Sequence, residues 1–113
     1  DTLERLRSDL ADVLQMRIDA DPANFGVYEE KIVTEIERRH YADAEAAAKL
    51  FAERFPKREE PYLLLMSLYY SMRSPNLFRE TLLSLKRSDT RLTNSGLKLV
   101  RFWSEGAGSV SYE

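Results

Sequence analysis

The sequence predicts an all-α protein built from antiparallel helical hairpins, with about six helices. Along its 113 residues, apolar positions recur at three- and four-residue spacing in one segment after another. The four prolines and four glycines stand mostly between these segments, where they mark turns. Hydrophobic residues make up 43% of the chain and charged residues 32%. This balance is typical of a single soluble domain whose helices each bury an apolar stripe.

The first helix is expected within residues 1–20, with Thr2 as its N-cap and an apolar stripe along one face. The stripe consists of Leu3, Leu6, Leu10, Val13, Leu14 and Ile18. We expect it to pack inside the chain. The alternative is an exposed homodimer face, because part of the stripe also fits a short heptad pattern. The residues of this candidate oligomer face are Leu3, Leu6, Leu10 and Val13.

Pro22 ends the first helix, because proline lacks an N–H and restricts the residue before it. A second helix is predicted over about 25–38. Its buried side should hold Phe25, Tyr28, Ile32 and Ile36, and its water-facing side Glu29, Glu30, Lys31 and Glu35. A third helix, over about 41–55, is rich in alanine. Small side chains let neighbouring backbones approach closely, so this helix should be tightly packed.

The fourth helix, over about 61–72, is apolar nearly all round, so it is expected either to be central or to carry a second apolar binding face. Ser74 and Pro75 predict the cap and the first residue of a fifth helix over about 75–86. A sixth helix is expected over about 93–105. Its apolar side should contain Leu97, Leu99, Val100 and Trp103. Residues 106–113 include two glycines and are predicted to form a flexible tail.

Three predicted helix ends stand 34 residues apart, at Pro22, Pro56 and Thr90. Large aromatic residues recur at the same spacing, at Tyr28 and Tyr62. With this period and these aromatics, the chain resembles the tetratricopeptide repeat (TPR) family.

The resemblance implies a single TPR-like domain over residues 1–105. It would comprise a helix at 1–20, repeats at 25–58 and 59–92, and a final helix at 93–105, stacked as a short right-handed superhelix. Glu35 and Gly96 depart from the pattern, because they stand where the family has aromatic residues. A non-repetitive six-helix bundle is the alternative.

The sequence predicts no catalytic, cofactor-binding or metal-binding site. The chain has no cysteine and one histidine, His40, which argues against thiolate chemistry and a hydrolytic triad. Glu37 and His40 have the Glu-x-x-His spacing of carboxylate metal sites, but such sites need a second histidine. We therefore expect His40 to lie at a hairpin corner without a ligand.

Another protein is the partner that the resemblance implies. In this family the first helix of each hairpin lines a groove that holds a peptide. The matching positions here are Glu29, Val33, Leu63, Ser67, Tyr70, Leu97 and Arg101. Because several of them are apolar, we expect a hydrophobic or helical segment as the ligand. Two alternatives stay open. The groove could be filled by the chain itself, including residues 110–112, or the chain could be a structural or oligomerisation domain that pairs through its terminal helices or continues a longer solenoid.

The compartment is not indicated by the sequence. A net charge of −2 favours neither nucleic acid nor an anionic membrane. No apolar run approaches the ~20 residues needed to cross a bilayer, so we expect no direct membrane insertion. Because the chain begins at Asp1 rather than Met, we expect a soluble domain from a longer protein. A larger or membrane-anchored bacterial assembly is one hypothesis.

Overall fold

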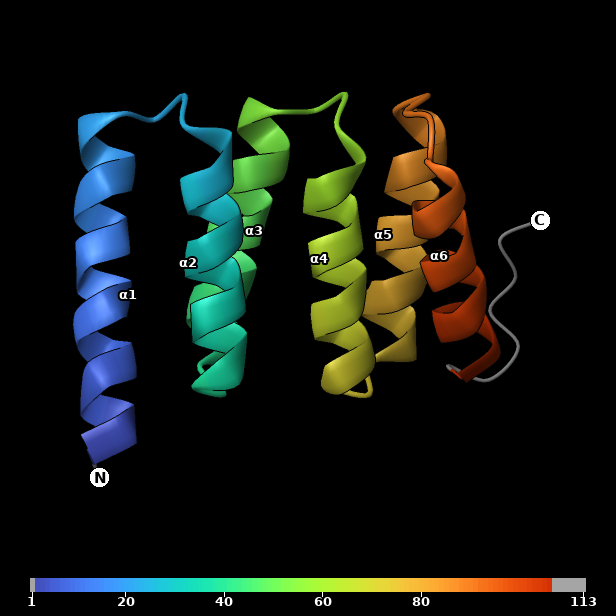
Figure 1. Ribbon diagram of the computed structural model, residues 1–113. Helices are drawn as coiled ribbons and strands as arrows, with labels where there is room; N and C mark the ends of the chain where they lie inside the picture. Colours follow the sequence, from blue (N-terminus) through green and yellow to red (C-terminus); the bar gives the residue numbers. More distant parts are fainter. Residues whose placement is uncertain (1, 107–113) are drawn as a thin grey trace. The chain divides into compact units, whose positions relative to one another are not determined.

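The computed structural model describes residues 2–106 and confirms an all-α fold. These residues form six helices and no strand (Figure 1): α1 (Thr2–Ala20), α2 (Phe25–Glu37), α3 (Tyr41–Arg54), α4 (Glu59–Ser71), α5 (Pro75–Arg87) and α6 (Asn94–Gly106). The predicted bounds agree to within about two residues. Gly106, predicted to begin the tail, ends α6, and residues 107–113 lie outside the described part. In residues 2–106, no helix combines the length and apolar character that crossing a bilayer requires.

The helices group into two compact units, Asp1–Arg54 and Phe55–Glu113, and each is described by itself. In the first unit, α2 packs against both α1 and α3. In the second unit, α4 packs against both α5 and α6. Within each unit, consecutive helices run in opposite directions (Figure 1). The apolar fourth helix is therefore central in its own unit.

The predicted 34-residue period is present in the hydrogen bonds of both units. The hydroxyl of Tyr28 donates to the carbonyl oxygen of Pro22 at 2.9 Å. The hydroxyl of Tyr62 donates in the same way to Pro56 at 3.2 Å. Each bond ties a proline-marked turn to the first turn of the helix that follows. The aromatic and proline positions of the repeat thus work as a pair.

The α2–α3 and α4–α5 turns repeat the same backbone geometry. Arg39 and Arg73, 34 residues apart, have positive φ angles of 61° and 55°. The N–H of the next residue donates to the carbonyl five residues earlier, at 2.9 Å for His40 and 3.0 Å for Ser74. This is the geometry of a Schellman motif, which usually has glycine at the left-handed position. Arginine adopts this conformation less readily, so packing and hydrogen bonds must hold both turns.

The core of the first unit is centred on Phe51 of α3, which is fully buried. Its ring stacks on that of Tyr28 at a centroid distance of 5.2 Å and meets that of Phe25 edge-on at 4.8 Å. Ala44 and Ala48, also on α3, have no exposed surface. The alanine-rich helix is therefore tightly packed on this side, while Ala42 and Ala46 on its other side are exposed.

The core of the second unit is built mainly from α4 and α5. Its buried apolar residues are Tyr62, Leu65, Met66, Leu68, Tyr69, Phe78, Leu82, Leu85 and Val100. Leu99 of α6, which was expected on the buried side, is 43% exposed. The expectation is wrong because Gly96 and Val100 form the buried side of α6, and Leu99 lies outside it.

The expectation that the α1 stripe packs inside the chain is wrong for most of its length. Leu14 and Ile18 are buried, but the other members and Met16 are largely exposed. The exposed fractions are 53% for Leu3, 60% for Leu6, 46% for Leu10, 50% for Val13 and 69% for Met16. Within its unit α1 packs against α2 and not against α3, so one side of it faces solvent. Thr2, predicted as the N-cap, lies within the helix.

Candidate protein-binding site

The α4 residues predicted to face a groove share one side of that helix. Leu63, Ser67 and Tyr70 are spaced by four and three residues, and each is half-buried. Leu97 and Arg101 take the places of Leu63 and Ser67 on α6, one repeat later; the first is half-buried and the second exposed. Because α6 packs against α4, the structure places these five residues on neighbouring helices. We call this surface the α4–α6 face.

A buried carboxylate joins the start of α6 to the start of α4. Glu59, 8% exposed, accepts hydrogen bonds from the backbone N–H of Thr93 at 3.0 Å and from its hydroxyl at 3.2 Å. The hydroxyl oxygen of Thr93 accepts the N–H of Gly96 at 3.0 Å, which is the bond an N-cap makes. In a capping box, a glutamate of the same helix accepts the backbone N–H of the N-cap residue. Here Glu59 of α4 accepts that N–H for α6.

This cap explains why Gly96 stands where Tyr28 and Tyr62 stand in the two preceding units. A Cβ at Gly96 would overlap the Oε1 atom of Glu59 and would lie 3.4 Å from the Cδ1 atom of Leu63. Any side chain there would displace the carboxylate from Thr93. The glycine therefore sets how closely α6 approaches α4 along the α4–α6 face.

We expect Gly96→Ala to lower the free energy of unfolding by about 1 kcal/mol, although alanine favours a helix over glycine by about that amount. The added methyl group should separate Glu59 from Thr93 and release two hydrogen bonds. Urea denaturation of Gly96→Ala, Glu59→Ala and the double variant measures the coupling between the two sites. The methyl group of Gly96→Ala should cost little stability once the Glu59 carboxylate is gone. Additive changes in the free energy of unfolding would therefore contradict this account.

A cleft of about 600 Å³ opens beside Tyr70 at one end of the α4–α6 face. It is lined by Tyr69, Tyr70, Ser71, Arg73, Ser74, Pro75, Phe78 and Gly106. A Cβ at Gly106 would stand only 2.7 Å from the Tyr70 hydroxyl, so the glycine allows α6 to pass close to this ring. The ring of Phe102 lies 6.3 Å from that of Tyr70. The sequence predicts Tyr70 as a site residue but not Phe102 or Gly106, whose four-residue spacing places both on the same side of α6.

Two predicted groove residues lie in the first unit. Glu29 is half-buried and Val33 is 43% exposed, at the α2 positions that correspond to Leu63 and Ser67. The α4–α6 face is therefore defined without them. Residues 110–112, which the sequence offered as a segment that could fill the groove, lie outside the described residues.

No protein-family model, curated protein or solved structure matches this chain. The resemblance to the TPR family therefore depends on the 34-residue period and on the sequence positions that follow it.

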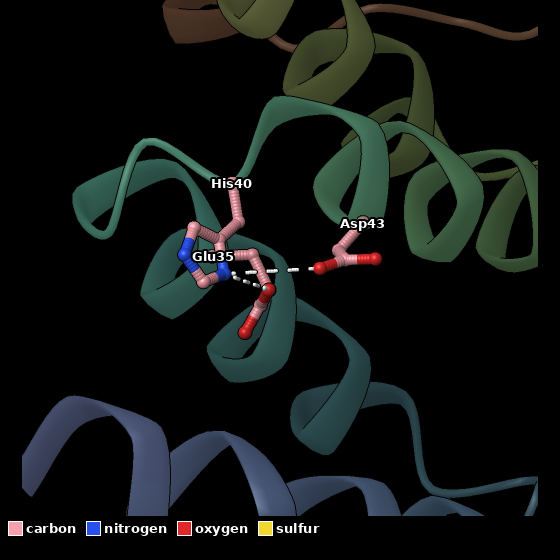
Figure 2. A group of neighbouring side chains, drawn as sticks. All are labelled: Glu35, His40 and Asp43. Carbon is pink, nitrogen blue, oxygen red and sulfur yellow. Dashed lines mark ion pairs between the residues drawn. The ribbon is translucent and has the colours of Figure 1, made fainter. Parts of the chain in front are cut away.

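A second group of polar residues lies at the α2–α3 turn of the first unit (Figure 2). The Nδ1 atom of His40 is 3.6 Å from a carboxylate oxygen of Glu35 and 3.7 Å from one of Asp43. The three side chains could offer ligand atoms within 4.8 Å of one another. The Glu-x-x-His spacing in the sequence pairs His40 with Glu37. In the structure, the Glu37 carboxylate instead lies 3.9 Å from the Nε atom of Arg7.

Glu35 is 1% exposed, so the prediction that it faces water is wrong. Its carboxylate accepts a hydrogen bond from the Nη1 atom of Arg38 at 2.8 Å and lies 3.7 Å from the Nζ atom of Lys31. Arg38 also donates from Nε to Glu4 of α1 at 3.0 Å, and this bond raises the pKa of Arg38 above its ordinary value. Two cations therefore compensate the buried carboxylate, as charge burial requires. A divalent cation beside them would be repelled, so we interpret this group as a structural ion network.

Proposed function

We propose that this chain is a non-catalytic, TPR-like protein-interaction module that binds a hydrophobic or helical segment of a partner protein within a larger assembly. The binding surface is the α4–α6 face. The observation that carries the proposal is the incomplete burial of Leu63 and Tyr70 on the central helix of a unit, where Tyr70 lines a cleft of about 600 Å³. Concave sites of this volume are typical of binding sites, and this cleft offers both apolar residues such as Phe78 and polar residues such as Arg73.

The chemistry of the face favours an amphipathic helix as the ligand. Leu63 and Tyr70 are seven residues apart, which matches the two-turn spacing of the anchors of such a helix. Leu97 adds a third apolar contact from α6. Tyr70 combines a large apolar ring with a hydroxyl, a combination common among residues that dominate binding energy. Arg101 is exposed on the same face and suits an acidic residue beside the anchors.

We expect Tyr70→Ala to weaken ligand binding by about tenfold while leaving the helix content unchanged. The probe is a set of fluorescently labelled amphipathic peptides with Leu or Phe at the first, fourth or fifth, and eighth positions. Fluorescence anisotropy measures binding, and circular dichroism measures the fold. Truncating the ring removes the anchor beside the cleft, whereas most core contacts of α4 are made by other residues.

Tyr41→Ala is the matched control. Tyr41 is also a half-buried tyrosine, but it lies on α3 in the other unit. Equal loss of binding in both variants, or loss of binding in proportion to loss of helix content, would contradict the assignment of Tyr70 to a binding face. Absence of binding by every peptide in the set would count against the proposed function itself.

A further inference from the structure

The last helix, α6, exposes apolar residues at positions that α4 buries. Leu99 and Phe102 are 43% and 63% exposed, whereas Leu65 and Leu68, one repeat earlier, are 6% and 0% exposed. α4 is followed by α5 and packs against it. Residues 2–106 contain no helix after α6. The apolar pattern of α6 is therefore that of the first helix of a hairpin, and its second helix is not among the described residues.

The first helix, α1, has the complementary property. Leu10 is 46% exposed, whereas Ala44 and Phe78, one and two repeats later, are 0% and 1% exposed. Leu14, by contrast, is buried like its counterpart Ala48. α1 is thus in phase with α3 and α5, the second helices of the two hairpins. Residues 2–106 include no helix before α1 that could cover Leu10.

We propose that copies of this chain associate head to tail, with α6 of one copy packing antiparallel against α1 of the next. The two helices would form a hairpin of the same kind as α2–α3 and α4–α5. Each contributes the apolar residues that its counterparts bury inside a hairpin. The interface uses Leu99 and Phe102. Leu99 lies on a different side of α6 from Leu97 and Arg101, whereas Phe102 also lies beside Tyr70 of the α4–α6 face, at a ring-centroid distance of 6.3 Å.

We infer the register of the α6–α1 pair from the α2–α3 hairpin, in which Phe51 of α3 contacts the rings of Phe25 and Tyr28 of α2. Carried onto α6 and α1 by the 34-residue spacing, these contacts place Leu99 opposite Val13 and Phe102 opposite Leu10 of the other copy. All four of these residues are 43% or more exposed. Exposed apolar side chains of the two helices therefore meet each other.

The charges beside these apolar contacts are complementary in the same register. Lys98 of α6 falls opposite Asp12 of the other copy, and Glu105 falls opposite Arg5. All four side chains are exposed, so they can turn toward a partner without breaking a buried contact. Opposite charges at both ends of one seam fix the register and the antiparallel direction.

The contact joins two different surfaces, so it is heterologous. Each copy keeps one α1 face and one α6 face available after pairing, and further copies can add to either end. The expected assembly is a concentration-dependent series or a closed ring, rather than a symmetric dimer.

Complementation between two variants tests the proposal. Leu10→Glu removes the α1 surface and Phe102→Glu removes the α6 surface, and both changes fall on exposed residues that the fold tolerates. Light scattering after size exclusion, at about 100 μM protein, should find oligomers for the natural chain and a monomer for each variant. An equal mixture of the two variants should form a 1:1 dimer, because each supplies the surface that the other lacks.

Leu83→Glu is the control, because Leu83 is an exposed leucine of α5 outside both surfaces; this variant should still form oligomers. Circular dichroism checks that all variants fold. Three outcomes would overturn the proposal: a monomeric natural chain, oligomers of Phe102→Glu, or a mixture of the two variants that stays monomeric. Oligomers of Phe102→Glu together with monomeric Leu10→Glu would indicate symmetric pairing through α1 instead.

Discussion

Phe51→Ala should lower the free energy of unfolding of the first unit by about 4 kcal/mol. The ring is fully buried and contacts both Phe25 and Tyr28 of α2. Its removal leaves a cavity between α2 and α3 that Ala44 and Ala48 are too small to fill. Urea denaturation followed by circular dichroism measures the loss. Amide hydrogen exchange should show that α2 and α3 lose protection first, because the substituted core belongs to their unit.

Phe102→Ala is the matched control for this prediction. It makes the same chemical change at a phenylalanine that is 63% exposed. Its expected cost is below about 0.5 kcal/mol, within the usual range of surface substitutions. A cost below about 1.5 kcal/mol for Phe51→Ala would contradict the central role of this ring.

Glu35→Ala should cost about 3 kcal/mol, although glutamate at this position departs from the repeat pattern. The substitution removes a buried carboxylate, leaves Lys31 without this ion pair and leaves Arg38 paired with Glu4 alone. It also loosens the connection to α1, because Arg38 joins Glu35 to Glu4. The effect should persist at about 1 M salt, since buried charges are poorly screened. Thermal unfolding at low and high salt measures both features.

Glu37→Ala is the control for the ion network. Glu37 lies on the same helix and pairs with Arg7 at 3.9 Å, but its side chain is 55% exposed. Its expected cost is below about 0.5 kcal/mol and should vanish in high salt. Similar costs for Glu35→Ala and Glu37→Ala would show that burial of the Glu35 carboxylate adds nothing to stability.

The helices and their period could be predicted from sequence because both depend on local patterns. Apolar spacing identifies each helix, and Pro22 and Pro56 mark turns whose chemistry is local. The bonds from Tyr28 to Pro22 and from Tyr62 to Pro56 then show why the aromatic residues recur with the prolines. A repeat in sequence appears as a repeat in geometry because each pair spans only six residues.

The candidate binding face was predicted in part. Leu63, Ser67 and Tyr70 could be placed on one side of α4 from helical spacing alone. The nearness of Phe102 and the cleft beside Tyr70 could not, because they depend on how closely α6 approaches α4. That approach depends in turn on Gly96, which leaves room for the Glu59 carboxylate.

By itself, the sequence determined the six helices, their turns and the 34-residue register, because these features arise from residues close together in the chain. The tertiary structure alone decided that Glu35 is buried and that Leu10 is exposed. Both residues sit at helix positions whose burial depends on the neighbouring helix. For Glu35 the cost of burial is offset by the charges of Lys31 on the same helix and of Arg38 at its C-cap. For Leu10 the described residues provide no helix to cover it. This side of α1 is therefore exposed to solvent, although its apolar pattern predicts burial.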